Sequence, residues 1–146
     1  MHVMVMVNEG TWETAVDVAA YWTPADGRFT LVHVLREDVE EVMRGSATGL
    51  MGRRPVDFTA AAGVFRQAAE ELLAAAADRL GRPCDTAILH GRAERAVTAA
   101  AVDADLLVLC RDGDRSRPGP HSLGPVTRFI SDHATCPVLL VWPAPD

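Results

Sequence analysis

The chain has 146 residues, 49% of them hydrophobic, and a formal net charge of −6. This length and hydrophobic fraction favour one packed globular domain, residues 1–146, and exclude a disordered chain. The acidic balance disfavours a nucleic-acid binder, which normally presents a basic face, and no apolar run approaches the roughly 20 residues of a membrane span.

The basic residues and the cysteines exclude several kinds of chemistry. All 14 basic residues are arginine, so the sequence contains neither a Walker-type phosphate loop nor a Schiff-base lysine. The three cysteines lie far apart, without the CxxC spacing of a zinc knuckle or a redox dithiol. Unpaired cysteines, and a first strand with no positively charged leader before it, favour a cytoplasmic protein.

Five apolar segments alternate with four helical patterns. The expected strands are residues 2–7, 28–35, 84–90, 105–110 and 136–142. The first expected helix is capped by Thr11 with Thr14, and a long helix ending at Gly81 carries Phe65 in its buried stripe. A shorter helix follows over 91–103, and the last expected helix covers 126–133.

This alternation predicts an α/β fold in which a parallel sheet lies between two layers of helices. Such sheets bind ligands at the carboxyl ends of strands, where the winding reverses. Residues 45–55 contain three glycines and a proline, which predict a floppy insertion, with a lid over the site as the alternative.

Residues 106–126 are the most informative stretch. An apolar strand turns into a basic loop with glycines and prolines, and the loop closes on the start of a helix. Strand, glycine loop and helix amino terminus form a layout that cradles phosphate, because backbone N–H groups and the helix dipole point into the loop. The alternative is a long surface loop, in which Asp112 and Asp114 belong to a solvated turn.

Four motifs occur in a characteristic order: LVHV at 31–34, HGRA at 90–93, ADLLVL at 104–109 and CPVLLV at 136–141. On these motifs the chain resembles the universal stress protein family over nearly its whole length. The resemblance implies a flavodoxin-like, Rossmann-like three-layer sandwich with a five-stranded parallel sheet in the order 3-2-1-4-5. It also implies a homodimer and, in the ATP-binding branch of the family, a nucleotide at the switch point of the sheet.

The pattern of that ATP-binding branch is only partly kept. The branch has an aspartate at the end of strand one, where this chain has Asn8. At the position of the first loop glycine this chain has Cys110, and the second glycine is kept as Gly113. The third glycine is Gly124, but ten residues separate it from Gly113, where the pattern has nine. Pro125 replaces the hydroxyl residue that follows, so that position has neither a hydroxyl nor an N–H for a phosphate.

The resemblance nevertheless implies a set of site residues. The expected nucleotide-binding residues are Asn8, Glu9, Val34, Leu109, Cys110, Arg111, Gly113, Gly124, Pro125 and Val126. Further candidates for phosphate contacts are Arg115, Arg117, His121 and Ser122.

Cys110 admits two interpretations. Its place near a helix amino terminus and Arg111 would lower its thiol pKa and give a reactive thiolate. A small buried hydrophobe at a strand end is the alternative. His121 and Cys110 lack the spacing of a metal site, so no metal is expected beyond Mg²⁺ bound to a nucleotide.

The sequence therefore predicts a cytoplasmic regulatory or stress-response module that binds an adenine nucleotide such as ATP weakly, without catalytic turnover. The alternative is a nucleotide-free dimeric scaffold that binds a protein partner; a small enzyme using Cys110 is a third possibility. Residues 138–142 would form a hydrophobic sheet edge, which predicts a two-fold dimer through that strand. Neither a nucleic-acid partner nor a membrane partner is expected.

Overall fold

The computed structural model describes residues 1–36, 58–113, 116–117, 119 and 122–145. Its elements in chain order are β1 His2–Met6, α1 Trp12–Trp22, β2 Arg28–Leu35, α3 Phe58–Leu80, β3 Cys84–His90, α4 Ala93–Ala100, the 3-10 turn η1 Ala101–Asp103, β4 Leu106–Cys110, α5 Pro125–His133 and β5 Val138–Val141. They alternate as the hydrophobic pattern predicts; β2 and β3 have the predicted bounds, and the ends of the other strands differ from the predicted ones by at most two residues.

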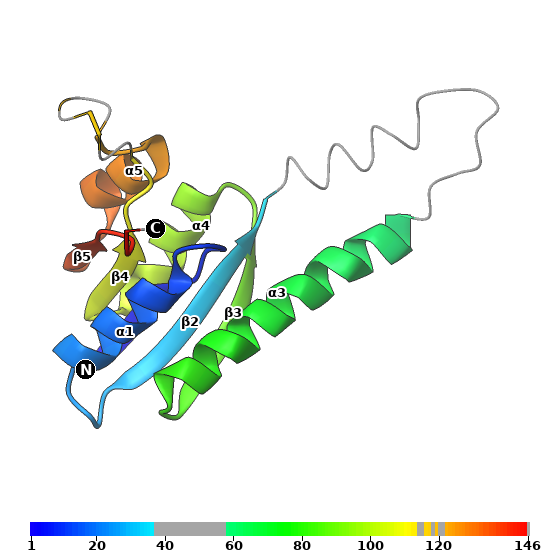
Figure 1. Ribbon diagram of the computed structural model, residues 1–146, viewed down its shortest axis with the longest axis horizontal. Helices are drawn as coiled ribbons and strands as arrows, with labels where there is room; N and C mark the ends of the chain where they lie inside the picture. Colours follow the sequence, from blue (N-terminus) through cyan, green and yellow to red (C-terminus); the bar gives the residue numbers. More distant parts are fainter. Residues whose placement is uncertain (37–57, 114–115, 118, 120–121, 146) are drawn as a thin grey trace.

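The strands form one parallel sheet in the order β3-β2-β1-β4-β5 (Figure 1). The predicted fold class and strand order are therefore confirmed. β1 and β4 are neighbours at the centre, with Val5 opposite Val108. β5 is an edge strand, whose outer side faces no described strand.

The sheet separates two hydrophobic cores, because side chains alternate between the faces of a strand. Val3, Val5 and Val7 of the first strand segment pack with α1 and α3 on one face. Met4 and Met6 pack with α4 and α5 on the other. Fully burying a side chain of this size stabilises a fold by about 1.5–3 kcal/mol. The buried side chains on both faces of β1 therefore stabilise the packing of the helices on each side of the sheet.

The long helix α3 covers the sheet with only part of its length. Leu73 and Leu80 are buried, whereas Val64 is 65% and Phe65 is 43% exposed. The prediction that Phe65 lies in the buried stripe is therefore wrong, because the amino-terminal half of α3 extends past the sheet (Figure 1). In the described part of the chain, no helix is long and apolar enough to cross a membrane.

The start of α1 also differs from the predicted cap. Thr11 is the N-cap residue, but its side chain forms no capping hydrogen bond. The hydroxyl of Thr14 instead accepts a hydrogen bond from the N–H of Ala144, at 3.2 Å. This bond ties the segment after β5 to α1.

Candidate functional site

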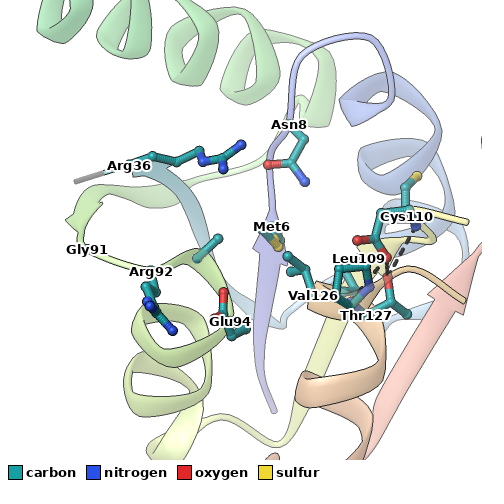
Figure 2. A pocket seen from close by; sticks show the side chains of 13 residues that line it. Met6, Asn8, Arg36, Gly91, Arg92, Glu94, Leu109, Cys110, Val126 and Thr127 are labelled. Atoms are coloured by element: carbon teal, nitrogen blue, oxygen red, sulfur yellow. Dashed lines mark hydrogen bonds between the residues drawn. The ribbon is translucent and has the colours of Figure 1, made fainter. Parts of the chain in front are cut away.

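A cavity of about 760 Å³ lies at the carboxyl ends of the central strands (Figure 2). β1 and β4 are adjacent and parallel, so the residues that follow them emerge side by side. Helices cover opposite faces on the two sides of this pair, which makes it the switch point of the sheet. The described residues that line the cavity are Met6, Asn8, Arg36, Gly91, Arg92, Ala93, Glu94, Leu109, Cys110, Asp112, Pro125, Val126 and Thr127.

Several residues predicted to bind nucleotide line this cavity, and they come from three parts of the chain. Asn8 follows β1, Leu109 and Cys110 end β4, and Pro125 and Val126 begin α5. Asn8 and Cys110 thus share one crevice, as the strand order requires. The cavity therefore has a strand-end wall and a helix-end wall, the two parts that a phosphate-binding layout needs.

The other predicted nucleotide-binding residues do not line the cavity. Val34 is 7% exposed and packs in the core beside α4 and α5. Glu9 is exposed in the turn after β1. The guanidinium carbon of Arg111 lies 3.5 Å from the centroid of the Trp142 ring, so this side chain stacks on the segment after β5.

The two loop glycines are held by close packing. A Cβ atom at Gly113 would collide with the backbone of Ser122, and a Cβ at Gly124 would collide with Asp112. The hydroxyl of Ser122 donates to the carbonyl of Gly119 at 2.8 Å. Both glycines therefore let two stretches of the loop approach each other.

The structure places the predicted phosphate contacts only in part. Arg117 is exposed, and Ser122 is half-buried. Arg115, His121 and the segment 45–55 lie outside the described residues.

The environment of Cys110 fits a small buried hydrophobe at a strand end and not a reactive thiolate. Its side chain is 6% exposed, and its thiol donates to the carbonyl of Thr11 with a sulfur–oxygen distance of 3.2 Å. Burial raises the pKa of the Cys110 thiol, an effect that the hydrogen bond to Thr11 only partly opposes. The direction of this pKa change supports the buried hydrophobe over the reactive thiolate, because desolvation is the largest influence on the thiol.

Asp112 has a role that the sequence analysis missed. Its carboxylate accepts hydrogen bonds from the backbone N–H of Thr127, at 3.1 Å, and from the Thr127 hydroxyl. The N–H of Asp112 donates to the same hydroxyl oxygen at 3.2 Å. Gly124, the N-cap of α5, has no side chain to cap the helix. Asp112 thus supplies from across the loop the cap that the local sequence lacks.

Several charged residues of the cavity also went unpredicted. Arg36 follows β2, and Arg92 and Glu94 lie at the start of α4 (Figure 2). Arg36 and Arg92 lie on the opposite side of the cavity from Thr127. The signal available was the strand order, because β2 and β3 end at the same edge of the sheet as β1. Across the described ranges, no group of three or more histidine, cysteine or carboxylate side chains is placed to hold a metal ion.

Comparison with protein families gives one match. The sequence model of the universal stress protein family matches residues 1–141. Among curated proteins, none matches the sequence.

Solved structures are similar over nearly the whole chain. The universal stress protein from Archaeoglobus fulgidus is 21% identical, with 96% of this chain and 97% of that chain covered and a TM-score of 0.67. A universal stress protein family protein from Arabidopsis thaliana, solved with AMP bound, is 21% identical, with 99% and 92% covered and a TM-score of 0.63. A universal stress protein in complex with cAMP is 14% identical, with 99% and 98% covered and a TM-score of 0.62. At identities this low, the likeness shows a shared fold.

Proposed function

Because the chain belongs to the universal stress protein family, we propose that it is a cytoplasmic regulatory or stress-response module that binds an adenine nucleotide weakly. It acts as one domain over residues 1–146. The observation that carries the proposal is the cavity of about 760 Å³ at the switch point of the sheet. Its volume lies within the range of about 300–1,000 Å³ typical of small-molecule sites, and its position is the usual one for nucleotides in such sheets.

The binding residues follow from the walls of the cavity. Asn8 offers a neutral amide at the end of β1, and the main chain at Leu109 and Val126 borders the cavity from β4 and α5. Arg36 and Arg92 contribute positive charge on the far side (Figure 2). Structures of this fold with AMP or cAMP support an adenine ligand for this chain too. Any magnesium would arrive with the nucleotide.

The proposal does not require turnover. Cys110, the one nucleophile that the sequence suggested, is buried, and burial raises the pKa of its thiol. A buried thiol with a raised pKa is a poor nucleophile at neutral pH.

A homodimer through β5 completes the proposal. The carbonyl of Pro137 accepts from Leu107 and that of Val141 from Arg111, so these residues face β4. Since backbone groups alternate along a strand, Val138 and Leu140 present theirs outward. An unpaired apolar edge of this kind is usually paired or covered.

A nucleotide-free dimeric scaffold that binds a protein partner is the second candidate. Pro125 favours it, because a helix that begins with proline has one N–H fewer for a phosphate. So does Asp112, whose carboxylate lies at that helix end.

Native mass spectrometry and calorimetric titration with AMP separate the two candidates. Ala93 lines the cavity at the start of α4, whereas Ala99 of the same helix is exposed and lies outside it. We expect AMP to bind the wild type and Ala99→Phe, and to bind Ala93→Phe much more weakly because the ring fills the cavity. An adenine nucleotide that co-purifies with the wild type would agree. If the wild type carries no nucleotide and binds no AMP, the nucleotide-free scaffold is the function that remains.

A further inference from the structure

The amino terminus of α5 is the part of the cavity where a phosphate would be expected. Helix amino termini bind anions because their first N–H groups have no partner within the helix. In α5, Pro125 has no N–H, and Thr127 donates its N–H to the carboxylate of Asp112 at 3.1 Å. Among the first three residues of this helix, only Val126 remains as a donor for a ligand.

The carboxylate of Asp112 is held there by several independent contacts. The Thr127 hydroxyl donates to it, and this hydroxyl accepts the N–H of Asp112 at 3.2 Å. Thr127 is fully buried. Gly124 lies so close to Asp112 that a Cβ there would collide with its backbone oxygen and carboxylate. An anion of the protein itself therefore takes the position of a bound phosphate.

A carboxylate in this position opposes phosphates in two ways. It uses the N–H of Thr127, and its charge repels a second anion across a short distance, with partial screening by solvent because Asp112 is exposed. Asp112 itself lines the cavity, so a chain of phosphates running toward α5 would meet it directly. The opposite side of the cavity carries two arginines and one carboxylate, Arg36, Arg92 and Glu94, so its charge is positive on balance (Figure 2).

We propose that Asp112 is a built-in anion that makes the cavity select adenosine or an adenine monophosphate and reject ATP. The inference rests on the proposed nucleotide site and specifies its ligand class. A ligand with one phosphate directs that group toward Arg36 and Arg92. A triphosphate has no room at α5 unless the carboxylate leaves.

Calorimetric titration of the wild type, Asp112→Asn and Asp112→Ala tests the proposal. The probes are adenosine, AMP, ATP and inorganic tripolyphosphate, without divalent cations, because Mg²⁺ would neutralise part of the phosphate charge. Asp112→Asn keeps the size of the side chain and removes its charge, and Asp112→Ala also releases the N–H of Thr127. Asp132→Asn is the matched control, because it removes one charge from an exposed position in the last turn of the same helix.

We expect the wild type to bind adenosine and AMP at least as tightly as ATP. Both Asp112 variants should gain ATP affinity, Asp112→Asn because the repelling charge is gone and Asp112→Ala also because the N–H of Thr127 is free. One hydrogen bond to a charged group is worth on the order of 10- to 100-fold, which is the gain expected for Asp112→Ala, with a smaller one for Asp112→Asn. Adenosine affinity should not change, and Asp132→Asn should behave as the wild type. If Asp112→Ala fails to fold, the proposal is still tested by the ATP affinity of Asp112→Asn and by the preference of the wild type for adenosine and AMP over ATP.

The probes separate failure of this inference from failure of the proposed function. If adenosine binds, but ATP binds the wild type more tightly or gains nothing in either Asp112 variant, the inference is wrong and the nucleotide site stands. If no adenine compound binds, but the variants gain affinity for tripolyphosphate, the proposed function fails while Asp112 still acts as the excluding anion. If the variants gain neither ATP nor tripolyphosphate, the inference is overturned.

Discussion

The carboxylate of Asp112 accepts hydrogen bonds from the backbone N–H of Thr127, at 3.1 Å, and from the Thr127 hydroxyl. The oxygen of that hydroxyl accepts a hydrogen bond from the backbone N–H of Asp112. This pair joins the end of β4 to the start of α5 across the intervening loop. It caps a helix whose own N-cap is glycine and whose first residue is proline. Both residues of this pair also line the cavity.

Replacing Thr127 by valine should destabilise the protein. Thr127 is fully buried, and its hydroxyl both donates to and accepts from Asp112. Valine keeps the shape but removes both hydrogen bonds of the hydroxyl, while the backbone N–H of residue 127 still donates to Asp112; the expected cost is about 1–3 kcal/mol in the free energy of unfolding. Urea denaturation measures it. Thr127→Ser is the control, because it keeps the hydroxyl; equal losses in both variants would show that packing, not the hydrogen bonds, matters here.

Cys110 should resist alkylation more than the other two cysteines. Cys84 and Cys136 are half-buried, whereas Cys110 is buried and donates to Thr11. Burial raises the pKa of all three thiols, so the lower accessibility of Cys110 sets the order of labelling. Timed labelling with iodoacetamide followed by peptide mass spectrometry should therefore detect Cys110 last, and readily only after denaturation. Labelling of Cys110 first would instead identify a reactive thiolate.

Stability at acidic pH should depend on Asp17. Arg79 donates two hydrogen bonds to its carboxylate, each at 2.7 Å, and these hold the pKa of Asp17 below its ordinary value. A carboxyl whose pKa is lower in the folded state stabilises the fold above its unfolded pKa and loses that contribution as the pH falls through the folded pKa.

The free energy of unfolding of the wild type should therefore exceed that of Asp17→Asn near neutral pH, by a small amount because the pair is exposed. The difference should shrink as the pH falls below 3.8, the ordinary value. Urea denaturation over a pH series, at low salt, provides the measurement. A difference that stays constant across the series would contradict the role of the carboxylate charge.

The wild type should be a dimer that depends on the outer edge of β5. Leu140→Pro removes a backbone N–H that points away from β4, while the bonds from β4 to Pro137 and Val141 remain. Light scattering at micromolar concentrations should report a dimer for the wild type and a monomer for the variant, with circular dichroism as the check on folding. A monomeric wild type would count against pairing through this edge.

The hydrophobic pattern was sufficient to predict a parallel sheet between helices, because apolar runs such as residues 106–110 alternate with helical periods, whereas the strand order came from the family resemblance. It failed for Phe65, since periodicity shows which face of a helix is apolar but not where the sheet beneath it ends. The strand order also brought Asn8 and Cys110 to one crevice. The bond between Asp112 and Thr127 escaped prediction, because two residues separated by a loop carry no spacing signal for their contact.

The most direct measurement is a two-dimensional ¹H–¹⁵N NMR titration of the wild type with AMP. The proposed site predicts that the amide signals of Asn8, Leu109 and Val126 shift with one common saturation curve, while those around Arg66 and Ile88, in the separate cleft between α3 and β3, do not. Shifts confined to that other cleft, or no saturable shift at the strand ends, would contradict an adenine nucleotide site between β1 and β4.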